Sequence, residues 1–135
     1  MKYLFLLFLI FYQGGNNIEV KSAWIRPAPA TFNTAFYCTI VNNNDTADTL
    51  YKAASGISDD VQIHETYMKN DMVGMRPVKF LVIAPHDSLI FKPGSYHIMM
   101  MNLKESAAEN TIKEISLYFK RAGELKVKAA VKSQH

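Results

Sequence analysis

The chain has 135 residues, of which 49% are hydrophobic and 20% are charged, a balance typical of one globular domain and not of two domains or a disordered chain. A formal net charge of +3, with basic residues interspersed among acidic ones, is too small to indicate a nucleic-acid-binding protein. The single cysteine, Cys38, excludes an internal disulfide bond and any metal site built from several cysteines.

The amino-terminal segment carries one positive charge, at Lys2, followed by an unbroken apolar run over residues 3–12. A run of about ten residues is short for a membrane-spanning helix, which needs roughly 20, but it suits the apolar part of a secretory signal. We therefore expect residues 1–15 to be a signal peptide and residues 16–135 to form an exported domain. An uncleaved amino-terminal anchor is the alternative.

From residue 17 onward, short runs rich in β-branched and aromatic residues are separated by turn residues at intervals of about ten. This pattern is typical of an antiparallel β-sandwich or barrel, so we predict an all-β fold with a single domain. Only residues 102–110 could hold a helical turn. Strands are predicted at residues 18–24, 35–41, 49–54, 61–68, 72–78, 80–83, 88–91, 96–101, 112–120 and 125–131.

Methionine and histidine are concentrated in one part of the chain. After Met1, the other six methionines all lie between positions 64 and 101, and three of the four histidines, His64, His86 and His97, share that window. Such a concentration of soft sulfur and imidazole is the most informative feature of the composition.

The predicted strands divide this concentration into faces. Residues 61–68 and 72–78 form a predicted hairpin, and a turn centred on Asn70 places His64 nearly opposite Met75, with a slip of one residue possible. His97 and Met99 are two residues apart on a later strand, so both side chains leave the same face. Two histidines and two methionines could therefore meet if that strand lies beside the hairpin.

A donor set of two imidazoles and two thioethers selects copper. The thioether is a soft, neutral ligand that suits Cu(I) and that zinc, calcium and magnesium largely ignore, while imidazole binds copper in either oxidation state. Thioethers also suit an oxidising compartment, since they form no disulfides and need no deprotonation before they bind a metal. The donor set and the export signal thus indicate the same kind of environment.

The spacing of His64, Met75, His97 and Met99 is H-x10-M-x21-H-x-M, and with this motif the chain resembles the periplasmic copper(I) chaperone family usually called PCuAC. Four residues at three fixed spacings make the match specific. Further segments that are similar to the family surround the four residues, at positions 23–27, 63–66, 75–78, 92–101 and 119–123.

The resemblance implies a cupredoxin-like β-sandwich in the periplasm that binds one Cu(I) through these four side chains and catalyses no reaction. It also implies a monomer that hands copper to an acceptor for assembly of the CuA centre of cytochrome c oxidase, either oxidase subunit II or an oxidase-assembly thiol protein. Two alternatives remain open, namely a copper redox or electron-transfer cupredoxin and a periplasmic copper buffering or resistance protein.

The remaining methionines have weaker assignments. Met68, Met72 and Met101 could form an outer shell that captures or releases copper, although surface or gap-filling methionine is an equally good interpretation. Met101 continues the row of His97 and Met99, whereas Met100 faces the other way and is expected in the core.

Two other residues are expected to have structural roles. His86 lies in an Ala-Pro-His-Asp turn and is predicted to be solvated. Cys38 is predicted to pack in the core. A blue-copper site needs a cysteine with two histidines and a weak axial methionine, so this placement makes electron transfer the more distant alternative.

Overall fold

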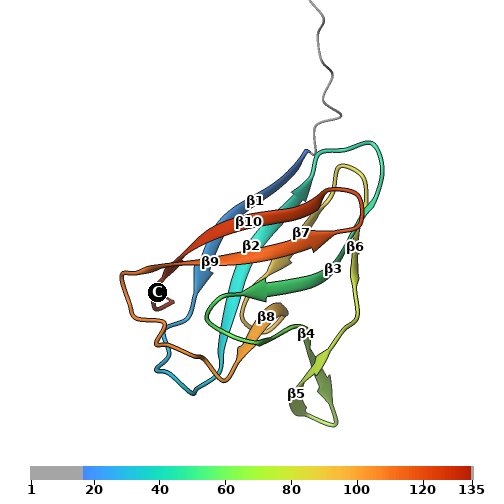
Figure 1. Ribbon diagram of the computed structural model, residues 1–135. Coiled ribbons are helices and arrows are strands. Elements are labelled where there is room, and N and C mark those ends of the chain that lie inside the picture. The colour runs from blue at the N-terminus through green and yellow to red at the C-terminus, as the bar shows by residue number, and fades with distance from the viewer. Residues whose placement is uncertain (1–16, 135) are drawn as a thin grey trace, which may run out of the picture.

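The computed structural model describes residues 17–134 (Figure 1), so the expected signal peptide, residues 1–15, lies outside the described residues. The described part is all-β, as predicted, and each observed strand overlaps a predicted one. Ten strands follow in order: β1 (Ile18–Ile25), β2 (Thr34–Asn42), β3 (Asp48–Ser55), β4 (Asp60–Lys69), β5 (Met72–Pro77), β6 (Leu81–Ile83), β7 (Ser88–Phe91), β8 (Tyr96–Met101), β9 (Ile112–Phe119) and β10 (Gly123–Val131).

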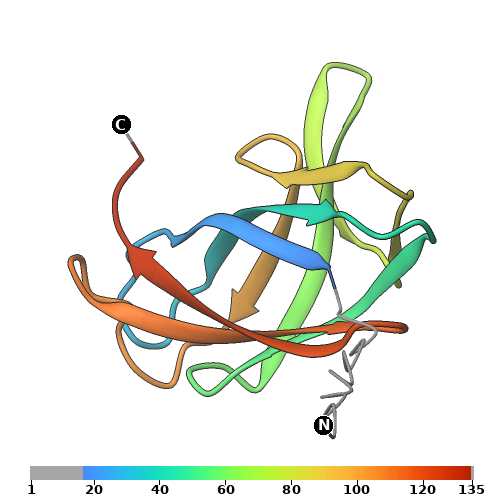
Figure 2. The same ribbon diagram turned by 90° about the horizontal axis from the view of Figure 1, so that it is seen from above.

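The strands form one continuous sheet in the order β5-β4-β8-β7-β2-β1-β10-β9-β3-β6, and β8 also pairs with β2. Most neighbours are antiparallel, as expected, but β1 pairs with β10 and β7 with β8 in parallel. Figures 1 and 2 show the sheet folded over, so that β9 and β10 lie across from β2 and β8. The result is a cupredoxin-like sandwich in which β5 is an edge strand.

The interior follows from strand alternation. Phe36, Cys38 and Ile40 of β2 are buried with Leu117 and Phe119 of β9 in one apolar cluster. Cys38 therefore packs in the core, as predicted, and burial raises the pKa of its thiol. A thiol that stays protonated in an apolar interior is an inert packing group.

Residues 102–110, the only segment in which the sequence allowed a helical turn, form no helix. Ala28 and Ala107 instead exchange backbone hydrogen bonds of 3.1 and 2.8 Å, which attaches this segment to the connection after β1. Asn102 and Asn110 have φ angles of 45° and 66°, and this left-handed conformation interrupts a right-handed helix at both ends of the segment.

One buried carboxylate joins two parts of the sandwich. Asp48, at the start of β3, accepts hydrogen bonds from the backbone N–H groups of Thr49, Arg121 and Ala122 at 2.7, 2.9 and 3.0 Å. Because Arg121 and Ala122 belong to the turn between β9 and β10, Asp48 holds that turn against β3.

Residues 17–134 include no helix with the length and apolar character needed to cross a membrane.

Candidate metal centre

The pairing of β4 with β8 brings the two candidate histidines together. His64 and His97 are direct cross-strand partners, and their ring centroids are 5.5 Å apart. Both are buried, with 8% of His64 and 2% of His97 exposed. Met99 follows two residues after His97, so its side chain leaves the same face of β8.

The register of the β4–β5 hairpin is shifted by one residue from that of a turn centred on Asn70, which is the slip that the sequence left open. Met75 lies opposite Thr66 and not nearly opposite His64, because the turn contains two residues, Asn70 and Asp71, and its centre falls between them. Both turn residues have left-handed φ angles, 51° and 62°, as in the type I′ turns of two-residue hairpins. Since Thr66 is two residues from His64, Met75 still shares the face of His64.

A hollow of about 210 Å³ contains three of the four candidate ligands. Its lining includes Met75, His97 and Met99, together with Arg26 and Tyr37. Met75 is 57% exposed, Met99 is half-buried and the histidines lie deepest. The candidate ligands are thus graded from the surface inward, with Met75 outermost.

Each histidine has one buried nitrogen without a hydrogen-bond partner among the described residues, Nδ1 of His64 and Nε2 of His97. The other nitrogens are occupied, because Nε2 of His64 donates to Oε1 of Gln62 at 2.7 Å and Nδ1 of His97 donates to the carbonyl of Ser95 at 3.3 Å. A neutral imidazole that donates from one nitrogen carries its lone pair on the other. Two adjacent buried lone pairs are the donors that a metal ion needs.

The protonation equilibria favour these lone pairs. Burial lowers the pKa of His64, and the neighbouring His97 acts in the same direction, whereas Asp60 opposes them. Burial also lowers the pKa of His97; the hydrogen bond to Ser95 opposes this effect and Arg26 adds to it. Both imidazoles are therefore neutral at neutral pH and able to bind a cation.

Aromatic side chains form one wall of the site. The Tyr37 ring lies 6.5 Å from the His97 ring and 4.7 Å from the Trp24 ring, between centroids. The Arg26 guanidinium lies over Tyr37 at 5.6 Å from its centroid. Tyr37 is on the face of β2 opposite to Cys38, so the site meets an aromatic ring and no thiol.

The three outer-shell candidates do not share one face. Met68 lies on the same face of the hairpin as Met75 and is 72% exposed. Met101 lies on the same face as Met99 and is partly buried. Met72 is similarly exposed, at 73%, but it projects from the opposite face of the hairpin.

Met100 and His86 lie where the sequence predicted them. Met100 is completely buried in the core. His86 occupies a turn position with a φ of 57°, and its exposed ring lies 2.7 Å from a carboxylate oxygen of Asp45.

Sequence reasoning missed Gln62 and Tyr37. Gln62 lies two residues before His64 on the same strand face, and Tyr37 lies two residues after Ala35, the cross-strand partner of Met99. Alternation within a strand could have identified Gln62. To predict that Tyr37 lies at the site, one must know that β2 and β8 are neighbours, which the sequence does not show.

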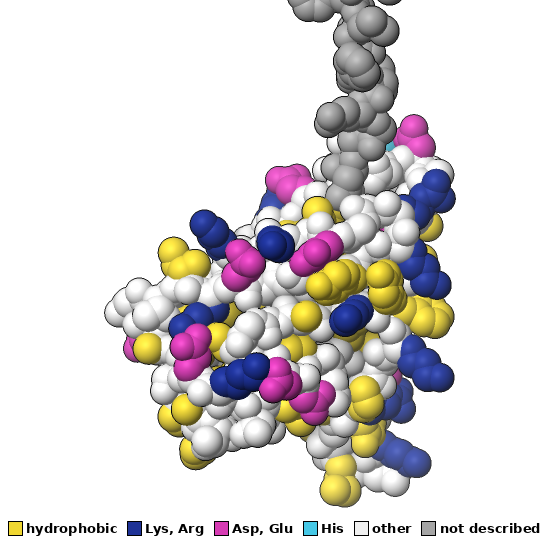
Figure 3. All heavy atoms as spheres, viewed as in Figure 1, with side chains coloured by type: hydrophobic (Ala, Val, Ile, Leu, Met, Phe, Trp, Pro, Cys, Tyr) yellow, Lys and Arg dark blue, Asp and Glu magenta, His cyan; other side chains and the backbone are white. Residues whose placement is uncertain are grey.

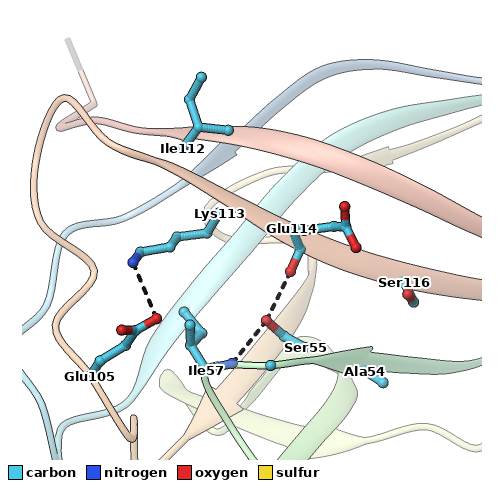
Figure 4. A pocket seen from close by; sticks show the side chains of 9 residues that line it. Ala54, Ser55, Ile57, Glu105, Ile112, Lys113, Glu114 and Ser116 are labelled. Atoms are coloured by element: carbon cyan, nitrogen blue, oxygen red, sulfur yellow. Dashed lines mark hydrogen bonds and ion pairs between the residues drawn. The ribbon is translucent and has the colours of Figure 1, made fainter.

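A second hollow, of about 530 Å³, lies between β3 and β9 (Figure 4). It contains an ion pair of 3.3 Å between Lys113 and Glu105, and Ser55 donates a hydrogen bond to the carbonyl of Glu114 at 2.9 Å. Its polar groups therefore bond one another. Across residues 17–134, no group of three or more His, Cys, Asp or Glu residues could hold a metal ion.

Comparison with known proteins places the chain in a family. The family described as putative lipoprotein LpqE-like matches residues 18–131. The putative lipoprotein Lxx21020 of Leifsonia xyli subsp. xyli is 30% identical over 90 residues, which cover 66% of this chain and 54% of that protein. The chain thus spans about half the length of this curated relative.

Solved structures with the same fold include the copper-bound PCuAC domain from PmoF2, with a TM-score of 0.73, 24% identity and coverage of 89% of this chain and 95% of that one. The apo PCuAC domain from PmoF1 has a TM-score of 0.72, 25% identity and coverage of 89% and 96%. The solution structure of CuI-DR1885 from Deinococcus radiodurans has a TM-score of 0.67, 26% identity and coverage of 89% and 83%. The chain therefore belongs to the LpqE-like family and, as its histidine and methionine motif predicted, to the PCuAC family.

Proposed function

We propose that the protein binds one Cu(I) ion through Nδ1 of His64, Nε2 of His97 and the thioether sulfurs of Met75 and Met99, and hands it to an acceptor protein. The observation that carries this proposal is the pair of adjacent buried imidazoles, each with one unpartnered nitrogen. A buried polar atom without a partner is costly, and a metal ion would satisfy both nitrogens at once.

The chemistry of the donor set supports Cu(I) as the cargo. All four ligands are neutral, and two are thioethers, which Cu(I) accepts and which zinc and calcium largely ignore. One structural neighbour, the PCuAC domain from PmoF2, is copper-bound and another, DR1885, is in its CuI form, which agrees with this choice.

The gradient of exposure supports transfer rather than storage. Met75 stands on the edge strand of a hairpin that projects from the sandwich (Figure 1), so an acceptor ligand could replace it first. The two buried histidines would hold the ion until a second acceptor ligand arrives. Met68 and Met101, on the same faces as Met75 and Met99, would serve as outer ligands that capture or release copper.

The acceptor in this proposal belongs to the assembly of the CuA centre of cytochrome c oxidase, either oxidase subunit II or an oxidase-assembly thiol protein. The names of the related lipoproteins support an exported protein of the cell envelope. In this proposal residues 1–15 direct export, residues 16–135 form the copper-carrying domain, and the carrier works in the periplasm as a monomer without catalytic activity.

A blue-copper electron carrier is the poorer alternative. Such a site needs a cysteine thiolate beside the histidines, whereas Cys38 faces the apolar core and Tyr37 faces the site. Copper buffering or resistance would use the same four ligands. A transfer assay that offers the copper-loaded protein to an apo CuA domain separates delivery from buffering.

An anaerobic titration of Cu(I) against a chromophoric chelator tests the binding proposal. We expect the parent protein to bind one ion per chain. We expect the variant His64→Ala/Met75→Ala to bind Cu(I) too weakly to take it from the chelator. The matched control His86→Ala/Met72→Leu removes the same types of donor at exposed positions away from the site and should keep the affinity. Tight binding that survives in His64→Ala/Met75→Ala would refute the ligand assignment.

A further inference from the structure

Three side chains on one face of β4 form a hydrogen-bonded series that ends at the copper-site histidine. Asp60, Gln62 and His64 occupy alternate positions of the strand. The Gln62 amide nitrogen donates to Oδ1 of Asp60 at 2.9 Å, and Nε2 of His64 donates to the Gln62 amide oxygen at 2.7 Å.

The Asp60 carboxylate determines which group in this series donates each hydrogen bond. An ionised carboxylate only accepts hydrogen bonds, so Gln62 must present its NH₂ group to Asp60. Its carbonyl oxygen is then left for His64 and can only accept, which requires a proton on Nε2. The lone pair of neutral His64 is thereby assigned to Nδ1, the nitrogen that has no partner.

The rotated arrangement is unfavourable. If the Gln62 amide turned by half a rotation about its last side-chain bond, its oxygen would face the Asp60 carboxylate and its NH₂ group would face His64. In that arrangement the Gln62 oxygen and the Asp60 carboxylate would be two acceptors facing each other without a proton between them. The Gln62 NH₂ group would donate to His64, so Nε2 of His64 would have to be unprotonated. Nδ1 would then carry the proton and could not bind a metal ion.

We propose that Gln62, oriented by Asp60, is a positioning residue that fixes the tautomer and ring orientation of His64, so that Nδ1 is the copper-binding atom. This inference deepens the proposed function and rests on it. For His97, a hydrogen bond from Nδ1 to the backbone carbonyl of Ser95 fixes the tautomer in the same way. The two histidines therefore present different nitrogens to one ion. Only the His64 half of the arrangement depends on side chains and is open to substitution.

The test begins with the apo protein, in which ¹H–¹⁵N correlation spectra at a pH where both imidazoles are neutral identify the protonated nitrogen of each ring. We expect Nε2–H of His64 to give a shifted, slowly exchanging proton signal, as a short hydrogen bond to an amide oxygen produces. Gln62→Leu should lose this signal and Gln62→Glu, which keeps an acceptor, should restore it. Asp60→Leu should weaken it, because the Gln62 amide is then free to turn.

Copper affinity is the second readout. Loss of a group that orients a metal ligand typically lowers metal affinity about 10- to 100-fold, and we expect Gln62→Leu to fall in this range. Gln62→Glu should bind Cu(I) at least as tightly as the parent protein. In the copper-loaded parent, which is diamagnetic, the ¹⁵N shift on metal binding should appear at Nδ1 of His64 and at Nε2 of His97.

The Nδ1–H signal of His97 is an internal control, since its acceptor is a backbone carbonyl that these substitutions leave in place. A proton on Nδ1 of His64 in the apo parent, or unchanged affinity and nitrogen assignment in Gln62→Leu, would overturn the inference. Failure of the parent protein to bind Cu(I) would instead refute the proposed function. In that case the apo spectra would still decide whether Gln62 sets the tautomer.

Discussion

At the scale of the residue, the two histidines of the candidate metal centre are unusual because each has a buried ring nitrogen without a hydrogen-bond partner among the described residues. His86, in contrast, lies in a turn, where its ring is exposed and lies beside Asp45. His64 and His97 are buried and each leaves one nitrogen unpartnered. Burial and an unpartnered nitrogen therefore distinguish the two proposed copper ligands from His86.

The gradient of burial predicts unequal losses when single ligands are removed. His97→Ala removes the most deeply buried donor, which water cannot replace easily, and should lower Cu(I) affinity more than Met75→Ala, whose side chain is already 57% exposed. Chelator competition under anaerobic conditions measures both. Equal losses in the two variants would contradict the assigned order of exchange.

The same burial predicts how the stability of the apo protein depends on pH. The pKa of His64 and that of His97 are lowered in the folded state, so the unfolded chain binds more protons as the pH falls through its own histidine pKa, about 6.5. We expect the free energy of unfolding to decrease as the pH is lowered through that range. Denaturant titrations at a series of pH values measure this, and His64→Gln/His97→Gln should show a weaker dependence.

At the scale of the element, the β4–β5 hairpin combines a precise register with an exposed edge. Left-handed φ angles at Asn70 and Asp71 give a two-residue turn, and this turn places Met68 and Met75 on one face and Met72 on the other. Figure 3 shows hydrophobic and basic side chains at the projecting end of the molecule, where the hairpin lies in Figure 1. The hairpin therefore carries the candidate ligand Met75 on an exposed edge of the sheet.

The two faces of the hairpin predict different roles for two equally exposed methionines. Met68→Leu should slow transfer of Cu(I) to an acceptor or chelator while leaving the equilibrium affinity nearly unchanged, because it removes an outer thioether beside Met75. Met72→Leu is the matched control, since Met72 has the same exposure on the opposite face. Stopped-flow measurement of transfer distinguishes the variants, and identical rates would exclude Met68 from the transfer route.

At the scale of the whole molecule, the folded sheet places the apolar core and the candidate metal centre on opposite faces of β2. The face of β2 that carries Phe36 and Cys38 belongs to the apolar core, whereas Tyr37 on the other face lines the hollow of the candidate metal centre. Asp48, which holds the β9–β10 turn against β3, is not among the residues that line that hollow.

This separation predicts that Asp48→Ala will weaken the fold without weakening the site. The substitution removes two partly buried hydrogen bonds, from the N–H groups of Arg121 and Ala122 to the Asp48 carboxylate, and the loss of hydrogen bonds to a carboxylate costs about 1–3 kcal/mol. Denaturant unfolding should show a loss of this size, while Cu(I) affinity measured well below the unfolding transition stays at the parent value. A parallel loss of affinity would mean that the two regions are coupled.

The sequence by itself determined the strands and the candidate ligands. Alternation of apolar residues and turn chemistry are local properties, so strands such as β7 and β8 are predicted with their observed bounds. The spacing of His64, Met75, His97 and Met99 is likewise a property of the chain, and it was enough to predict the family.

Only the tertiary structure decided how these residues meet. The register of the hairpin depends on a two-residue turn whose centre lies between Asn70 and Asp71, and the pairing of β4 with β8, more than 30 residues apart, makes His64 and His97 neighbours. The hydrogen bond from His64 to Gln62 is local to β4, but the burial that leaves one nitrogen of each ring unpartnered follows from that packing. Long-range pairing and burial depend on the whole folded chain, so the sequence alone did not show that the two imidazoles lie side by side in a buried position.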